Sequence, residues 1–115
     1  MTIRTGSPGD WVSIDNNGLA LRCWWSVDDT KLDDIDPILG INRVYIVLPE
    51  VFGLNAWVRS VADRLAAQGL PALAIPLFAR SAPDLDLSYK ASDLAQGRRH
   101  KDATTTSQIL SDLSV

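Results

Sequence analysis

The chain has 115 residues, of which 46% are hydrophobic, and this length and composition fit one folded domain with a buried core. Its formal net charge of -3 gives no general attraction for nucleic acid or an anionic membrane, because both require a surplus of Lys and Arg on one face. No apolar run reaches the roughly 18 residues of a membrane span, and residues 1–10 lack the apolar core of a signal peptide. A single cysteine permits no internal disulfide, so we expect a cytoplasmic protein. From the charge and the short apolar runs we expect neither nucleic-acid nor membrane partners.

The first predicted element is an antiparallel hairpin. Residues 11–14 and 19–25 have the apolar and aromatic composition of strands, and they flank the sequence DNNG at 15–18. Asn and Gly tolerate positive φ, which the tight turns of hairpins require. We therefore expect these two strands to pair with each other.

Residues 28–42 form an acidic stretch without helical or strand period, which is typical of a solvated connection. The acidic residues in it are Asp28, Asp29, Asp33, Asp34 and Asp36. A Ca²⁺ site is the alternative interpretation, but the stretch lacks the regularly spaced ligands, central Gly and closing Glu of an EF-hand loop. We expect no metal site here.

The middle of the chain predicts a βαβ unit of a mostly parallel sheet, and hence an α/β fold. Residues 44–48 are a continuous apolar run, typical of a strand covered on both faces, and residues 70–75 are a second such run. Between them we expect a helix over 55–68 that Asn55 caps and Gly69 ends. Its apolar stripe consists of Trp57, Val58, Val61, Ala62, Leu65 and Ala66. Strands 43–49 and 70–76 should be parallel neighbours, with Trp57, Val61 and Leu65 mostly buried.

The end of the chain predicts a single helix over residues 102–115, with Asp102 as its cap. Before it, RRHK at 98–101 is typical of a solvated basic turn, with His100 as catalytic base or phosphate ligand as the alternative. Cys23 lies in a strand pattern, where a small, buried, inert thiol is favoured over a reactive one.

Glu50 stands out, because it is the only glutamate among the 14 acidic residues and follows a predicted buried strand directly. Ligands of open α/β folds bind at the carboxyl ends of the parallel strands, which gives Glu50 a functional position. The alternative is a structural carboxylate that is solvated or paired with Arg59 or Arg80.

Several segments around Glu50 together resemble the dienelactone hydrolase family of α/β-hydrolases, from about Val12 to Pro83. They are LPEVFGLN at 48–55, Arg59, VADRLA at 61–66, Gly69, LFAR at 77–80 and AP at 82–83. The resemblance implies that Glu50 contacts the resting nucleophile and that the backbone amide of Val51 helps form the oxyanion hole. It also implies that Phe52 lines the substrate pocket and that Arg80 holds a substrate carboxylate. A planar guanidinium suits that task, although a surface Arg paired with Asp84 or Asp86 is the alternative.

The chain contains no nucleophile elbow of the form Gly-x-Cys-x-Gly or Gly-x-Ser-x-Gly, and no Asp and His that follow it, all of which such a hydrolase needs. We therefore expect residues 1–115 to be the N-terminal portion of one hydrolase domain, inactive alone, whose partner is the C-terminal half. The completed enzyme would hydrolyse a carboxylic ester or lactone through a Cys or Ser nucleophile and needs no cofactor. The alternative is a complete small α/β protein that binds a partner or a small ligand without chemistry.

Overall fold

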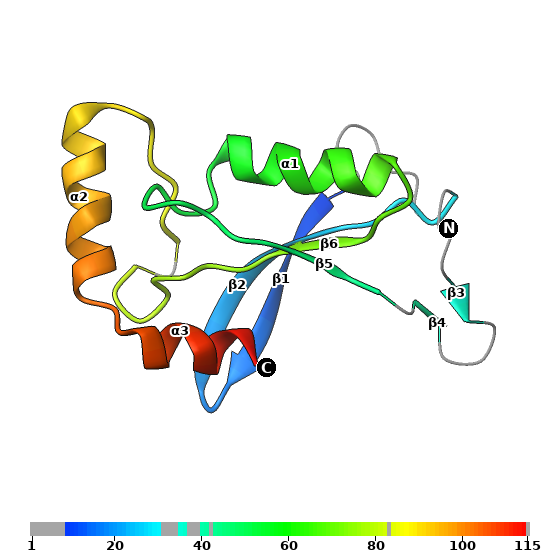
Figure 1. The fold of residues 1–115 in the computed structure, drawn as a ribbon, viewed down its shortest axis with the longest axis horizontal. Helices are drawn as coiled ribbons and strands as arrows, with labels where there is room; N and C mark the ends of the chain where they lie inside the picture. The colour runs from blue at the N-terminus through cyan, green and yellow to red at the C-terminus, as the bar shows by residue number, and fades with distance from the viewer. Residues whose placement is uncertain (1–8, 31–34, 37–39, 42, 83, 115) are drawn as a thin grey trace.

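The computed structural model describes residues 9–30, 35–36, 40–41, 43–82 and 84–114 (Figure 1). The strands are β1 (Gly9–Asn16), β2 (Leu19–Ser26), β3 (Ile35–Asp36), β4 (Gly40–Ile41), β5 (Tyr45–Val47) and β6 (Ala72–Ala74), and the helices are α1 (Ala56–Ala67), α2 (Ala91–Asp102) and α3 (Thr106–Leu113). Four strands form one sheet in the order β1-β2-β6-β5, and β3 and β4 form a separate antiparallel pair. Helix α1 lies along one face of the sheet and α3 lies on the other side, while α2 stands across the end of the sheet (Figure 1).

The predicted hairpin is confirmed. Strands β1 and β2 pair antiparallel along their whole length, from Gly9 opposite Ser26 to Asn16 opposite Leu19. Asn17 and Gly18 form the turn with φ of 52° and 91°, the left-handed conformations that this dipeptide tolerates best. The Asp15 carboxylate accepts a hydrogen bond from the Gly18 N–H at 3.3 Å.

The predicted βαβ unit is also confirmed. Strands β5 and β6 are parallel neighbours, and β6 pairs antiparallel with β2, which joins the unit to the hairpin. Asn55 caps α1 as expected, because its side chain accepts a hydrogen bond from the Val58 N–H at 3.1 Å. Gly69, at φ 84°, ends the helical segment.

The expected burial of Trp57 is wrong, because this residue is 54% exposed. Helix α1 instead buries Val58, Ala62 and Ala66, whose spacing of four places them in one narrow line. Val61 and Leu65 are only half-buried. A small sheet covers only this line of the helix, so the rest of the predicted apolar stripe faces away from it.

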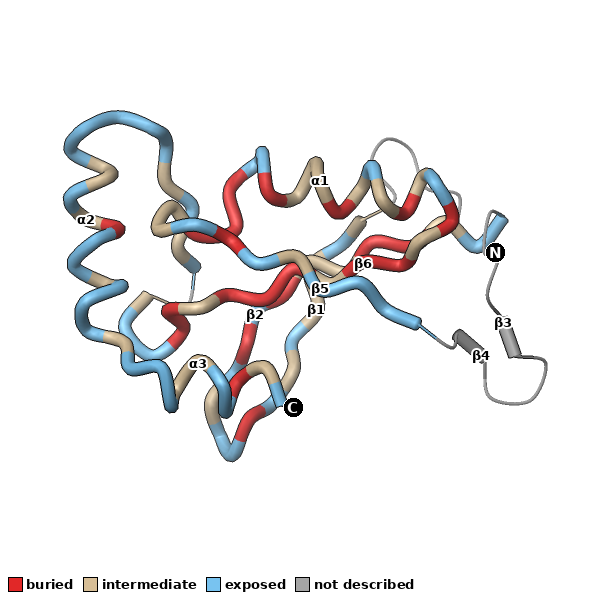
Figure 2. The backbone as a smooth tube through the Cα atoms, viewed as in Figure 1, coloured by how far each residue is buried: buried red, intermediate tan, exposed pale blue. Residues whose placement is uncertain are grey.

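The expected covering of the first parallel strand on both faces is wrong as well. Strand β5 is at the edge of the sheet, where Ile46 is 49% and the following Leu48 is 53% exposed. Figure 2 shows the buried backbone concentrated along β2 and β6, whereas the segment around the start of β5 is exposed. Only β6, with Ala72 and Ala74 fully buried, has the environment that the sequence predicts for both strands.

The core has a part on each face of the sheet. On the α1 face Leu54, Val58 and Ala74 are buried, with Trp11, Trp24 and Val47 packed against them. On the α3 face the buried residues are Leu21, Cys23, Ile75 and Ala79, and Leu113 is the residue of α3 that packs against them.

A polar contact ties α1 to β2. The carboxylate of Asp63 accepts hydrogen bonds from the Trp24 Nε1–H at 2.9 Å and from the Ser26 hydroxyl at 2.7 Å. Ser26 is fully buried, so its hydroxyl depends on this acceptor in place of water.

The prediction of one helix over 102–115 is wrong, and residues 98–101 do not form a turn. Residues 91–102 are helical, with Asp102 as the last residue of α2. Helix α3 begins after Thr105, whose side chain accepts from the Gln108 N–H while the Gln108 side chain accepts from the Thr105 N–H. This reciprocal capping box, Thr-x-x-Gln, was visible in the sequence as a start signal.

The acidic connection also differs from the expectation, since β3 and β4 lie within it. Asp33 and Asp34 lie outside the described residues. Within the described part, no group of three His, Cys, Asp or Glu side chains could hold a metal ion. None of the described helices is long and apolar enough to cross a bilayer.

We predict that Asp63→Ala lowers the free energy of unfolding by about 1 to 3 kcal/mol, because it leaves the buried Ser26 hydroxyl and the Trp24 indole without their acceptor. Urea denaturation of the variant and the parent measures the loss. Asp29→Ala removes an exposed carboxylate and is the matched control, expected to change stability by less than about 0.5 kcal/mol. Equal stabilities of the two variants would contradict the contact.

Candidate active-site loops

Glu50 and Arg80 follow neighbouring parallel strands. The chain leaves β5 and β6 at the same end of the sheet, the left in Figure 1, and the two residues come three and six positions after the strands end. Glu50 is exposed, and its carboxylate has no hydrogen-bond or ion-pair partner among the described residues, so neither Arg59 nor Arg80 pairs with it. The carboxylate is therefore open to a group from outside this part of the chain.

The residues after Glu50 form a tight turn that only glycine can close. The Gly53 N–H donates to the Glu50 carbonyl at 3.3 Å, and Gly53 has a φ of 75°. A Cβ at Gly53 would lie 2.1 Å from the carbonyl oxygen of Leu85, far inside contact distance. The turn thus depends on the absence of a side chain both for its backbone conformation and for its packing.

A segment distant in sequence pairs with this turn. The Leu54 N–H donates to the Leu85 carbonyl at 3.0 Å, and the Leu87 N–H donates to the Phe52 carbonyl at 2.8 Å. The Phe52 ring packs edge-to-face against Tyr89, with ring centroids 4.6 Å apart. Phe52 is therefore held by its backbone and by its ring.

Helix α2 packs directly on Val51. Gly97 is the buried residue of α2, and a Cβ there would lie 2.2 Å from the Val51 carbonyl oxygen. The Val51 N–H donates to no described residue. The loop is thus packed against α2 through the Val51 carbonyl.

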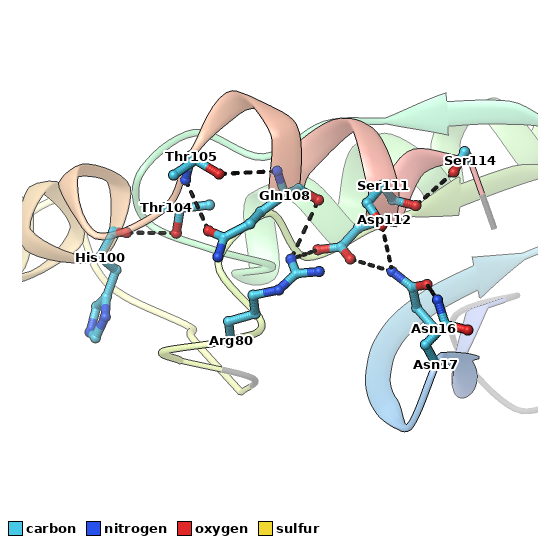
Figure 3. A network of polar contacts seen from close by, with 10 residues as sticks. All are labelled: Asn16, Asn17, Arg80, His100, Thr104, Thr105, Gln108, Ser111, Asp112 and Ser114. Atoms are coloured by element: carbon cyan, nitrogen blue, oxygen red, sulfur yellow. Dashed lines mark hydrogen bonds and ion pairs between the residues drawn. The ribbon is translucent and has the colours of Figure 1, made fainter.

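Arg80 lies in a polar network beside α3 (Figure 3). Its Nη1 donates to the Asp112 carboxylate at 2.8 Å and to the Gln108 carbonyl at 3.4 Å. The alternative left open by the sequence, a surface Arg near Asp84 or Asp86, is wrong in its partners, because these residues pair with Arg22 at 3.7 Å and Arg59 at 3.6 Å.

Asp112 was not predicted from the sequence as a site residue. Its side chain is only 1% exposed, and its second oxygen accepts a hydrogen bond from the Asn16 amide at 2.6 Å. A signal was present, because Asp112 falls on the apolar stripe of Ile109 and Leu113, at the spacing that places it toward the sheet. A carboxylate at such a position requires a partner.

Two residues that could do chemistry are poorly placed for it. Burial raises the pKa of the Cys23 thiol to about 11, which agrees with the expected inert thiol. His100 lies in α2, with its Nδ1 3.0 Å from the Ser81 hydroxyl. No described residue hydrogen-bonds the other ring nitrogen, so this pair lacks the third group that orients a catalytic base.

A match to a known protein family identifies the kind of protein that contains these loops. Residues 40–115 match the profile of the Dienelactone hydrolase family. The chain belongs to the dienelactone hydrolase family. A protein of Synechocystis sp. named "Putative carboxymethylenebutenolidase" is 40% identical over 75 residues, which are 65% of this chain and 30% of that protein. The predicted resemblance to this family is confirmed.

Solved structures support the α/β-hydrolase fold. A crystal structure of a "Putative Dienelactone Hydrolase" from Klebsiella pneumoniae aligns with a TM-score of 0.69 and 22% identity, covering 96% of this chain and 42% of that one. A structure named m3DLH aligns with a TM-score of 0.59 and 24% identity, covering 83% of this chain and 34% of that one. The chain thus spans less than half the length of each of these relatives.

We predict that Gly97→Ala destabilises the protein by about 1 to 3 kcal/mol, because the added methyl group forces α2 away from the Val51 carbonyl. Helix propensity alone predicts the opposite sign, since Ala stabilises a helix by about 1 kcal/mol relative to Gly. Urea denaturation distinguishes the two. Ser92→Ala, at an exposed position of the same helix, is the control and should be neutral or slightly stabilising. A Gly97→Ala variant as stable as its parent would refute the packing of α2 on the loop.

Proposed function

We propose that this chain is part of an enzyme that hydrolyses a carboxylic ester or a lactone, and that it contributes the oxyanion-hole and substrate-anchoring part of the active site. Membership of the dienelactone hydrolase family supports a hydrolase. The single observation that carries the finer proposal is the turn from Glu50 to Gly53, which is rigidly held and has an unpaired N–H at Val51.

In this proposal the Val51 N–H is one of two oxyanion donors. α/β-Hydrolases place such a donor in the loop between a sheet strand and the first flanking helix, the position of Val51 between β5 and α1. A donor fixed beforehand stabilises the tetrahedral oxyanion without reorganisation, and losing one costs roughly 3 to 4 kcal/mol of barrier lowering. The contacts of Gly53 and Gly97 supply that rigidity.

The nucleophile in this proposal is a Cys or Ser outside these 115 residues. It attacks the carbonyl carbon while a His takes its proton and an Asp orients that His; the His then returns the proton to the leaving alkoxide, and water hydrolyses the acyl-enzyme. Glu50 contacts the resting nucleophile, a role that its exposed and unpaired carboxylate permits. Phe52 lines the pocket, and no cofactor is required.

Arg80 is the proposed anchor for a substrate carboxylate. It follows the strand adjacent to the one that leads to Glu50, so both groups emerge at the same edge of the sheet. Its side chain is 32% exposed despite the ion pair with Asp112. The substrate class this favours is an ester or lactone that carries a free carboxylate.

The proposed partner of this chain is the remaining polypeptide of the hydrolase domain. The exposed apolar residues of β5 and the length of the solved relatives support this proposal, since a strand edge with apolar faces requires a cover. The single cysteine, buried and unpaired, fits a reducing compartment, and we propose a cytoplasmic location.

We predict that Arg80→Ala, in the enzyme that carries both parts of the domain, raises KM for an acidic ester by about 10- to 100-fold and leaves KM for the matched neutral ester nearly unchanged. The reason is that the carboxylate contact acts on binding before and during the reaction. Steady-state kinetics with a hemisuccinate aryl ester and its methyl ester measures both. An equal loss on the two esters would argue against the anchor.

We also predict that residues 1–115 alone hydrolyse an activated aryl ester no faster than buffer, because no described group is placed and activated to attack the carbonyl. Co-expression with a polypeptide that carries the elbow, Asp and His should restore turnover. The complementing half alone is the control. Turnover by residues 1–115 alone would overturn the divided active site and direct attention to Ser81 and His100.

A further inference from the structure

We propose that Asp112 is a positioning residue, which fixes the guanidinium of Arg80 so that one edge of it faces an acidic substrate. This inference rests on the proposed role of Arg80 as the carboxylate anchor. In this proposal Asp112 on α3 and its contact Asn16, at the end of β1, both help to set the substrate specificity.

Asp112 is held more firmly than an ordinary surface carboxylate. One of its oxygens accepts from Arg80 Nη1 at 2.8 Å, and the other accepts from Asn16 Nδ2 at 2.6 Å. The same amide nitrogen of Asn16 lies 3.3 Å from the Ser111 hydroxyl, to which it donates. With both oxygens occupied and the side chain buried, the carboxylate has a single orientation (Figure 3).

The contacts of Arg80 all fall on one nitrogen. Nη1 donates to Asp112 and to the Gln108 carbonyl, and neither Nε nor Nη2 has an acceptor among the described residues. The N–H bonds of Nε and Nη2 lie parallel along one edge of the planar guanidinium, at the spacing of two carboxylate oxygens. Asp112 therefore binds the guanidinium at Nη1 and leaves the edge formed by Nε and Nη2 free to donate two hydrogen bonds to a substrate carboxylate.

This pair differs from two other ion pairs of the described residues, Arg22–Asp84 and Arg59–Asp86. Asp84 and Asp86 are exposed, and their contacts with Arg22 and Arg59 are 3.7 and 3.6 Å long. Exposed pairs at such distances fix little, because water competes for both partners. Of these three carboxylates, Asp112 alone combines burial, a short contact and a second bond on its other oxygen, which are the properties that fix an orientation.

Three parts of the chain meet at Asp112. Asn16 comes from the end of β1, Arg80 from the segment after β6, and Asp112 from α3. The position of Arg80 therefore depends on how the hairpin turn and α3 sit against the sheet. Loss of the carboxylate would allow Arg80 to adopt several rotamers, and only one of them directs the Nε and Nη2 edge toward the substrate.

The test is Asp112→Asn in the enzyme that carries both parts of the domain, assayed with the hemisuccinate aryl ester and its methyl ester. We expect KM for the acidic ester to rise by about tenfold, the equivalent of one charge-assisted hydrogen bond, with kcat and the KM for the neutral ester changed less than about twofold. Asp102→Asn removes an exposed carboxylate at the end of α2 and is the control, with both KM values unchanged.

A double-mutant cycle separates positioning from general stability. In an Arg80→Ala background, Asp112→Asn should add no further increase in KM for the acidic ester, since there is no guanidinium left to orient. A parental enzyme that hydrolyses neither ester would refute the proposed function. A parental enzyme that prefers the acidic ester through Arg80, combined with a folded Asp112→Asn variant of unchanged KM, would refute the positioning role alone.

Asn16→Ala provides the second variant if Asp112→Asn does not fold, as circular dichroism would show. It removes the contact to one carboxylate oxygen and keeps the ion pair with Arg80. We expect a selective rise of about two- to threefold in KM for the acidic ester, smaller than for Asp112→Asn because the carboxylate and its ion pair with Arg80 remain. An equal rise for both esters, or none, would refute the inference.

Discussion

The parallel pairing of β5 with β6 is the constraint on which the candidate site depends. Tyr45 lies opposite Ala72 and Val47 lies opposite Ala74, so the two strands end at the same edge of the sheet. Parallel pairing requires a crossover, which α1 supplies, and the alanines of β6 and α1 let the helix approach the sheet closely. The loops that carry Glu50 and Arg80 emerge together as a consequence of this arrangement.

Two close backbone approaches then fix the first of these loops. Gly53 touches the Leu85 carbonyl and Gly97 touches the Val51 carbonyl, and neither approach leaves room for a Cβ. A helix interior is an unfavourable place for Gly, so the presence of Gly97 in α2 has its physical reason in the loop that it contacts. The backbone of this loop is thus packed against Leu85 and Gly97, which are more than 30 positions away from Val51 in the sequence.

The second loop is fixed by charge. A buried carboxylate is stable only when its oxygens are paired, and Asp112 satisfies this condition with one contact to Arg80 and one to Asn16. The core on the α3 face contains one residue of α3, Leu113. The polar network therefore contributes much of the contact that holds α3 against the sheet, and it also fixes the guanidinium of Arg80.

Local sequence determined those parts of the structure whose energies are local. The Asn17–Gly18 turn, the Asn55 cap and the Gly69 stop each depend on the backbone preferences of one or two residues, and each was predicted correctly. The resemblance to the dienelactone hydrolase family could also be recognised from local sequence, because the motif around Glu50 lies within one strand, turn and helix.

Only the tertiary structure decided the burial of Trp57 and of β5 and the partner of Arg80. An apolar run indicates that a strand prefers burial, but whether it is covered depends on which other segments lie beside it, and β5 lies at the edge of the sheet. Arg80 and Asp112 are 32 positions apart, and Asn16 and Asp112 are 96 apart, so no local period connects them. Their pairing arises from the packing of α3 beside the hairpin turn, because contacts between side chains distant in sequence exist only once the backbone has brought them together.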